Sequence, residues 1–452
     1  MKQLLSKFSM NNLFAGLIVA VVALPLCIAF AVASGVTPMA GVVSGVVGGF
    51  IAAAFGSSRF QVSGPAAAFI TILYGITAEH GFPVLLASTL VAGVVVIAIG
   101  LLRLGRIMDL MPHSVIVGFT AGIGVLIFLG QLPAAFGLPS EGKTVLDKLG
   151  SAVAHAGSAN FHEFLVLAVT VAVALLWGRT RHARSAPAPL VALVTGTLAA
   201  AGVGLMGGSV KTVGGLFDMS LSGLQPSWAF LGAAAEHWRT ILVSGGVLGV
   251  LIAVESLLSS KALDSMAGGS HDPDKELRGI GLANIAVPFV GGIPVSGVIV
   301  RGSTNVMSGG TEKTAAMMHA VFLGLFVVAL QDAIRLLPMA ALAAVLLLTA
   351  RRLVEVHELR RIFAMDRWEG ALAVVTAALT VAVDLTVSVP VGLVLMLLLA
   401  LRRMADDLRV DVKERHGQPV LAVNSSVTFM TASAVREALE HHLRDGKLRV
   451  LD

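Results

Sequence analysis

The sequence is poor in charged residues and contains a single cysteine. Only 13% of its 452 residues are charged, whereas 56% are hydrophobic. Soluble domains carry about a quarter charged residues, so this composition excludes a soluble enzyme of this length. Cys27 lies inside an apolar run, which excludes a secreted disulfide scaffold. From Phe8 to Ser58 there is no Asp, Glu, Lys, Arg or His. This stretch is long enough to cross a membrane twice, because one helical span needs about 20 apolar residues.

Apolar runs predict an all-α membrane protein with thirteen or fourteen spans. They cover residues 13–34, 36–55, 62–78, 82–102, 114–137, 164–178, 190–205, 241–258, 279–300, 315–330, 333–350, 370–383 and 385–401. Dividing 279–300 at residues 291–294 (Gly-Gly-Ile-Pro) gives fourteen. With a cytoplasmic N-terminus, nineteen Lys and Arg then lie in cytoplasmic loops and five in outer loops, as the positive-inside rule requires. We therefore expect fourteen spans with both termini cytoplasmic. The net charge of +5 reflects these loops rather than a nucleic-acid partner. No signal peptide is expected, because the first apolar run continues directly into the second.

Fourteen spans divide into seven and seven, and a seven-span unit and its copy must be inverted in the membrane. Val-Ser-Gly opens the third span at residues 62–64 and recurs at 295–297, at the opening of the tenth. Gly and Pro around both points predict short extended segments leading into half-helices. The N-termini of two half-helices near the bilayer midplane would attract an anion. The alternative is a pair of ordinary Gly/Pro kinks, which are common in membrane helices.

Two charged residues fall inside the spans. Arg301 lies seven residues after Pro294, and an intramembrane arginine suggests a functional site. The alternative is a cytoplasmic anchor that snorkels from a short span. Glu255 lies in the middle of the eighth span, where a carboxylate would be stabilised by a proton or a cation, and Ser259 follows one turn later. We therefore expect Glu255 and Ser259 to bind a coupling ion, although Glu255 could also be a structural partner of Arg301.

Other polar residues suggest no chemistry. We expect Asp384 in an outer turn, and His113 and His319 at span entrances, where they would be interfacial. The sequence contains no metal-ligand cluster, no nucleophile motif and no phosphate-binding loop that fits its context. We therefore expect no catalytic residues, no metal and no cofactor.

Four motifs now carry a family resemblance. They are Ala-Leu-Pro-Leu-Cys-Ile-Ala-Phe-Ala at 23–31; Phe-Gly-Ser-Ser-Arg at 55–59; Glu-Ser-Leu-Leu-Ser at 255–259 with Asp264, His271, Asp272, Lys275, Glu276, Leu277 and residues 279–284; and residues 291–297 with Arg301, Thr304, Asn305 and residues 308–310. With these motifs, nearly the whole chain resembles the SulP family of anion transporters (solute carrier family 26).

The resemblance implies a seven-plus-seven inverted repeat with a core and a gate domain, and an anion between the half-helices of spans three and ten. It implies a substrate site formed by Phe30, Ser63, Gly64, Pro65, Ala66, Ile299, Val300 and Arg301. Glu255 matches an acidic position that helps to bind sodium as Asp in some bacterial relatives, and glutamate suggests protons instead. Leu26 and Val300 replace a Gln and a Ser that are frequent in the family, so the anion would depend more on backbone N–H groups and Arg301.

We expect a transmembrane domain over residues 1–404, with repeats at about 8–210 and 236–404. Residues 405–452 are more charged and resemble the start of a cytoplasmic STAS domain, incomplete here, with a strand at 420–423 and a helix at 432–443. A truncated chain would explain the missing part. The alternative is a naturally short, partly disordered tail.

The sequence thus predicts a secondary active transporter of the cell inner membrane, not an enzyme, that works by an elevator-like movement. Our first expectation is proton-coupled symport of an organic anion such as a dicarboxylate. Sodium-coupled bicarbonate or sulfate uptake is the second, and an anion exchanger or channel is the third. A uracil- or xanthine-type permease is disfavoured, because those carry acidic and polar residues where this chain has Arg301. Expected partners are the anion, the coupling ion (proton or sodium), membrane lipid and, from the resemblance, a second copy in a homodimer.

Overall fold

The computed structural model describes residues 9–105, 113–139, 145–180, 188–217, 228–382, 410–415 and 418–423. Most of them are helical. The α-helices are α2 (Met10–Ala33), α3 (Pro38–Val43), α4 (Gly49–Phe55), α5 (Ile70–His80), α6 (Phe82–Leu101), α7 (His113–Ala135), α8 (Val145–Ala154), α9 (Phe161–Trp177), α10 (Ala188–Leu205), α11 (Val213–Leu216), α12 (Ala233–Ala267), α13 (Pro273–Ala286), α14 (Ile299–Met307), α15 (Lys313–Ala329), α16 (Gln331–Arg335), α17 (Met339–Leu353), α18 (Val356–Met365) and α19 (Arg367–Ala382). A π-helix, η1 (Ser44–Gly48), joins α3 to α4, and the 3₁₀ helices η2 (Ala67–Phe69) and η8 (Val287–Val290) adjoin α5 and α13.

Several helices have the length and composition of membrane spans. Among the described residues, five are long and apolar enough to cross a bilayer: Met10–Ala33, Pro38–Phe55, Phe82–Leu101, Ala188–Leu205 and Glu236–Ala267. Shorter apolar helices include Phe161–Trp177 and Lys313–Ala329. The expectation of a helical membrane protein is confirmed. The final predicted span at 385–401 and Asp384 lie outside the described residues.

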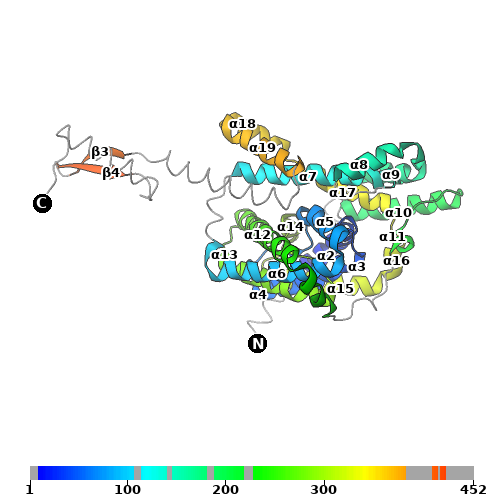
Figure 1. Cartoon of the computed structure of the whole chain (residues 1–452), viewed down its shortest axis with the longest axis horizontal. Helices are drawn as coiled ribbons and strands as arrows, with labels where there is room; N and C mark the ends of the chain where they lie inside the picture. Colours follow the sequence, from blue (N-terminus) through cyan, green and yellow to red (C-terminus); the bar gives the residue numbers. More distant parts are fainter. Residues whose placement is uncertain are drawn as a thin grey trace.

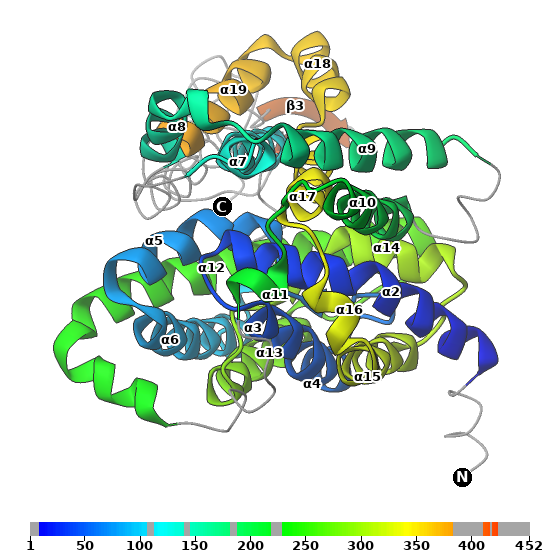
Figure 2. The same ribbon diagram turned by 90° about the vertical axis from the view of Figure 1, so that its right-hand side faces the viewer.

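The helices form two groups, which Figures 1 and 2 show as two layers. The first group contains α2–α6 and α12–α15, and the second contains α7–α10 and α17–α19. Along the chain the first group is visited, then the second, then the first and the second again. This order is what a duplicated unit would give. α12 and α13 both pack extensively on α6, and α15 packs on α2, so segments from the two halves of the chain interleave within the first group.

The predicted interruptions in the third and tenth spans are present. Two-residue strands β1 (Ser63–Gly64) and β2 (Ser296–Gly297) precede η2–α5 and α14, and they pair antiparallel with each other. Ser63 lies opposite Gly297, and Gly64 lies opposite Ser296. The repeated Val-Ser-Gly segments are therefore each other's partners. The N–H of Val298 extends the pairing by donating to the Val62 carbonyl at 3.2 Å.

Side chains form hydrogen bonds with the other backbone N–H and C=O groups around the interruption. The Asn284 side chain donates to the Val295 carbonyl at 2.8 Å and accepts from the Val295 N–H at 2.9 Å. Ser44 Oγ accepts from the Ile293 N–H at 2.6 Å, and Ser256 Oγ accepts from the Gly297 N–H at 3.0 Å. Unpaired backbone groups are very costly in hydrocarbon, so these bonds make the interruption tolerable.

Three parts of the sequence prediction need correction or remain outside the described residues. The predicted span 333–350 is two helices, α16 and α17, because Pro338 leaves the helix to form a β-bridge with Thr212. Sequence reasoning also missed α8 and α18, which are short and carry too many polar residues to form apolar runs. The tail strand predicted at 420–423 lies within β4 (Gln418–Val423), which pairs with β3 (Val410–Arg415). The predicted tail helix at 432–443 lies outside the described residues.

A contact joins the two helix groups through α8. The Lys148 ammonium of α8 lies 3.0 Å from the ring centroid of Tyr74 on α5, which is the sole tyrosine of the chain. An aromatic face attracts a cation, most strongly where water is excluded. Burial acts in the opposite direction and lowers the pKa of Lys148 to about 8. Burial thus favours the neutral amine of Lys148 in the folded protein.

We expect the stability of the protein to rise with pH between about 8 and 10.5. In this window the unfolded chain keeps a proton on Lys148 that the folded protein has released, so raising the pH favours the folded state. The melting temperature in detergent should rise by roughly a few degrees across the window. Lys148→Met should flatten this rise, whereas Lys275→Met, at an exposed position, should leave it unchanged. An unchanged slope in Lys148→Met would contradict the assignment.

Candidate functional site

Arg301 is the centre of the candidate site. It is the third residue of α14, and its side chain is fully buried at 0% exposure. Its Nη2 donates to the Pro65 carbonyl at 3.2 Å and contacts Cys27 Sγ at 3.4 Å. Nε and Nη1 have no hydrogen-bond partner, and Arg301 forms no ion pair with any described carboxylate. A buried charge without a counter-ion is costly, so a guanidinium left in this state is suited to receive an anion.

The position of the guanidinium depends on Gly64. A Cβ at this position would overlap Arg301 Nη1, so any side chain would displace the guanidinium from β1. The Pro65 carbonyl follows directly, at the point where the backbone leaves β1. Arg301 therefore spans the two interruptions: it is carried by the tenth-span half-helix and bonds to the backbone of the third.

Both helices that follow the strands begin without a side-chain cap. Ala66 precedes η2 and Val298 precedes α14, and neither offers a hydrogen-bonding side chain. The first N–H groups of a helix have no partner within it and carry partial positive charge. At α14 these groups belong to Ile299, Val300 and Arg301. The uncapped N-terminus of α14 and the guanidinium thus place positive potential in one region.

Glu255 lies on α12 beside β2. Its Oε2 accepts a hydrogen bond from Ser296 Oγ at 2.6 Å. Ser259, one turn further on, is fully buried, and its hydroxyl has no partner. Glu255 and Arg301 do not form a direct ion pair, but their charges interact. Both roles of Glu255, as a structural partner of Arg301 and as an ion-binding residue, therefore stay predictions. The carboxylate, two serine hydroxyls and the adjacent backbone provide only oxygen ligands, which suits a proton or a small hard cation.

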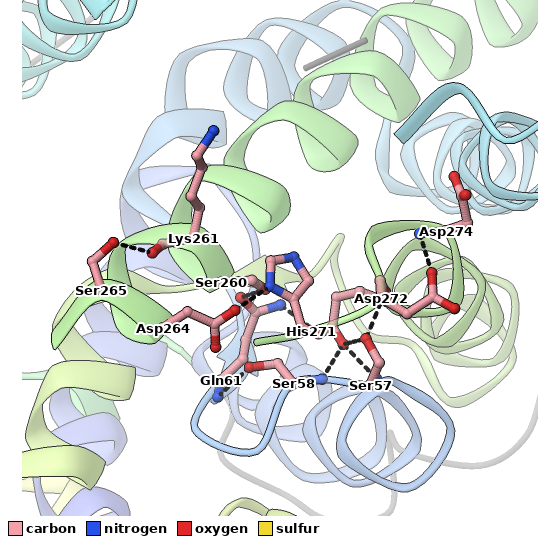
Figure 3. A network of polar contacts seen from close by, with 11 residues as sticks. Ser57, Ser58, Gln61, Ser260, Lys261, Asp264, Ser265, His271, Asp272 and Asp274 are labelled. Atoms are coloured by element: carbon pink, nitrogen blue, oxygen red, sulfur yellow. Dashed lines mark hydrogen bonds and ion pairs between the residues drawn. The ribbon is translucent and has the colours of Figure 1, made fainter. Parts of the chain in front are cut away.

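A polar network holds the segment before β1 against α12 and α13, and Figure 3 labels Ser57, Ser58, Gln61 and Ser260 among its members. Glu276 Oε2 accepts from the N–H groups of Ser57 and Ser58 at 2.6 and 2.7 Å, and Oε1 accepts from Gln61 Nε2 at 2.7 Å. The side-chain oxygen of Gln61, Oε1, in turn accepts a hydrogen bond from Ser260 Oγ at 2.6 Å. The motifs at 55–59 and 275–277, far apart in the chain, are therefore in direct contact.

A second contact closes the turn between α12 and α13. His271 Nδ1 lies 2.6 Å from Asp264 Oδ2, and Ser57 Oγ donates to the Asp272 carbonyl at 2.6 Å. These bonds fix the segment before β1 relative to the helix that carries Glu255. The network is thus a scaffold for the site rather than part of it.

The structure brings together some of the predicted substrate residues and separates others. Gly64, Pro65 and Arg301 are in contact, and Ser63 is paired in β1. Phe30 is buried on α2, in the same apolar cluster as Ala67 and Ala68. Ala66 is buried, whereas Ile299 and Val300 are exposed at 44% and 36%. The first two residues of α14 are therefore exposed, whereas the Arg301 side chain that follows them is buried.

Sequence reasoning missed Cys27, Gln61 and Asn284 as partners of the site. Polar residues at the two motif junctions were a signal for Gln61 and Asn284, but no pattern pointed to the thiol. The expectation for His319 was wrong. It is not interfacial but fully buried in α15, where α2 and α4 pack against this helix. The side chain of His113 lies outside the described residues.

Comparison with known proteins identifies the family of the chain. A family model described as the Sulfate permease family matches residues 10–376. The chain belongs to the sulfate permease family. Among its relatives, the putative sulfate transporter YvdB of Bacillus subtilis is 34% identical over 427 residues, which cover 92% of this chain and 78% of YvdB. The bicarbonate transporter BicA of Picosynechococcus is 30% identical over 407 residues, covering 88% of this chain and 71% of BicA.

Two solved structures of transporters share the fold of this chain. The transmembrane domain of a cyanobacterial BicA matches with a TM-score of 0.76 and 28% identity, covering 84% of this chain and 97% of that domain. The murine Slc26a9 anion transporter matches with a TM-score of 0.80, covering 96% of this chain and 78% of that chain; at 16% identity it bears on the fold alone. The chain is therefore a membrane anion transporter.

We expect Gly64→Ala to weaken anion binding at least about tenfold, because the added methyl group displaces the Arg301 guanidinium. The measurement is the KM for uptake of labelled bicarbonate and sulfate into proteoliposomes. Gly75→Ala is the matched control, since a methyl group at this position of α5 would meet nothing within 4 Å. Equal KM values in the two variants would contradict the role given to Gly64.

Proposed function

We propose that this protein is a secondary active transporter that takes up a small oxyanion, of the bicarbonate or sulfate class, together with protons. The observation that carries the proposal is Arg301: a buried guanidinium with two unpaired N–H-bearing nitrogens, at the uncapped N-terminus of a half-helix. The relatives named as bicarbonate and sulfate transporters support this substrate class. A dicarboxylate, the first expectation from the sequence, remains a candidate, since a carboxylate would use the same donors.

We assign Phe30, Ser63, Gly64, Pro65, Ala66, Ile299, Val300 and Arg301 to the anion site. Within this set the residues act in different ways. Gly64 and Pro65 hold the guanidinium, Ile299 and Val300 offer backbone N–H groups, and Phe30 provides part of the apolar wall. A site built mainly from backbone donors selects charge and size more than the identity of the anion.

The coupling ion is assigned to Glu255 and Ser259. A glutamate bonded to one serine and set one turn from a second can exchange a proton without rearranging the backbone. Sodium, the alternative coupling ion, would use the same carboxylate and hydroxyl oxygens.

For the movement itself we propose an elevator-like displacement of the first helix group against the second. The site is built entirely within the first group, from α2, α12, α14 and the segment around β1, so it can move as one body. We also propose fourteen spans in a seven-plus-seven inverted repeat, with both termini cytoplasmic, in the cell inner membrane. The repeated order of the helix groups and the pairing of the two Val-Ser-Gly segments support the repeat.

Replacing Arg301 tests the anion site. In proteoliposomes given labelled bicarbonate, sulfate or succinate, Arg301→Ala should reduce saturable uptake about ten- to a hundredfold, because the charged donor is lost. Arg335→Ala, an exposed arginine paired with Asp332, is the control. Normal transport by Arg301→Ala would make Arg301 a structural anchor. Wild-type transport that neither saturates nor accumulates an anion would indicate a channel.

Replacing Glu255 tests the coupling. Glu255→Gln should abolish accumulation driven by a pH gradient, while exchange of anion against anion continues, because glutamine cannot take up the proton. Glu236→Gln, exposed on the same helix, should behave as the wild type. If Glu255→Gln still accumulates anion against its gradient, the coupling site lies elsewhere. If a sodium gradient alone drives wild-type uptake, the coupling ion is sodium.

A further inference from the structure

His319 is a buried titratable group that the proposed mechanism does not yet use. It lies in α15, at 0% exposure, in the first helix group. Neither ring nitrogen has a hydrogen-bond partner of acceptable geometry, although the carbonyl of Ala316 lies beside the ring. Buried polar side chains almost always find partners. An imidazole kept without any is therefore a candidate for a role that needs a free nitrogen.

The ring faces the same strand that holds Arg301. A methyl group placed on Gly49 would lie 2.9 Å from the Ser63 carbonyl oxygen and 3.9 Å from His319 Nδ1. The ring and the carbonyl thus both lie next to Gly49, where the Ser63 carbonyl oxygen comes too close for any side chain. The next residue, Gly64, makes room for the Arg301 guanidinium. His319 and Arg301 therefore lie beside adjacent residues of β1.

No other described charge competes with Arg301 at this position. The helices that pack on α15 are α2, α3, η1, α4 and α16. Residues 38–55 contain no titratable group, and α2 offers only the Cys27 thiol, which is buried against Arg301. Lys313, at the start of α15, donates to the Gly56 carbonyl at 2.8 Å, more than one turn away from His319. Asp332 and Arg335 lie beyond the other end of α15.

We propose that His319 is a second proton-binding site, which takes up a proton when an anion binds at Arg301. While the anion site is empty, the unpaired guanidinium repels a proton from the imidazole. A bound anion compensates the guanidinium charge, so a proton from water can bind to the unpaired Nδ1. The inference rests on the proposed function, because it requires the anion to bind at Arg301.

Linkage makes the effect reciprocal: if the anion raises proton affinity, acidification must raise anion affinity by the same factor. Sulfate is a suitable probe, since it does not titrate near neutral pH. Calorimetric titration of the detergent-solubilised protein, in buffers of different ionisation enthalpy, gives both the sulfate Kd and the number of protons taken up per anion. We expect the wild-type Kd to fall about tenfold between about pH 8 and pH 5.5, around the usual histidine range.

His319→Gln should lower the number of protons taken up per sulfate by as much as one, and should hold the Kd near its high-pH value. At about pH 8, where the imidazole is neutral in both states, the variant should bind sulfate as the wild type does, which separates a lost proton site from misfolding. His319→Asn is the second variant, should glutamine not fit. Glu255→Gln should keep the part of the proton uptake that His319 provides.

The outcomes separate this inference from the proposed function. If wild-type protein binds sulfate with a Kd independent of pH, or if His319→Gln keeps the wild-type proton count, the inference is wrong while the anion site stands. If neither sulfate nor bicarbonate binds the wild-type protein, or if Arg301→Ala binds them normally, the proposed function fails and the inference fails with it.

Discussion

A backbone that leaves the helical conformation inside a membrane must find its hydrogen bonds within the protein. The site of this transporter depends on how the chain meets that constraint. Ser63 and Gly64 pair with Ser296 and Gly297, and Asn284, Ser44 and Ser256 bond the flanking backbone. The backbone N–H groups that these bonds leave without a partner are those of the first turns of the helices that follow the strands. The arrangement that stabilises the interruption is therefore also the one that leaves donors for an anion.

The absence of a side chain at Gly64 also determines where the positive charge of Arg301 lies. Because position 64 has no side chain, the Arg301 guanidinium lies against the strand backbone and bonds the Pro65 carbonyl. The polar network around Glu276 keeps this strand in position from its other end. An arginine fixed in this way loses little further freedom when an anion arrives, so more of the binding free energy appears as affinity.

The sequence was sufficient to predict the interruptions and to single out Arg301 and Glu255 as candidates, because charges and Gly-Pro clusters are rare in apolar spans and repeated motifs can be compared by position. It was not sufficient for contacts between distant segments. Gln61 and Glu276 lie in ordinary polar junctions, and only the folded chain shows that they meet. His319 was misplaced because it follows Lys313 by six residues, near the edge of an apolar run. What buries it is the packing of α2 and α4 on that face of α15, which periodicity cannot reveal.

The proposed assignments also account for charge during transport, when moving net charge through a low-dielectric barrier is costly. With the site empty, Arg301 and an ionised Glu255 sum to zero. A monoanion such as bicarbonate restores neutrality if Glu255 takes one proton. A dianion such as sulfate needs a second proton, and within the described part of the first helix group His319 is the titratable side chain that flanks β1 opposite Arg301. Two proton sites around one arginine would let a single framework carry anions of either charge, which fits a family whose members are named for both bicarbonate and sulfate.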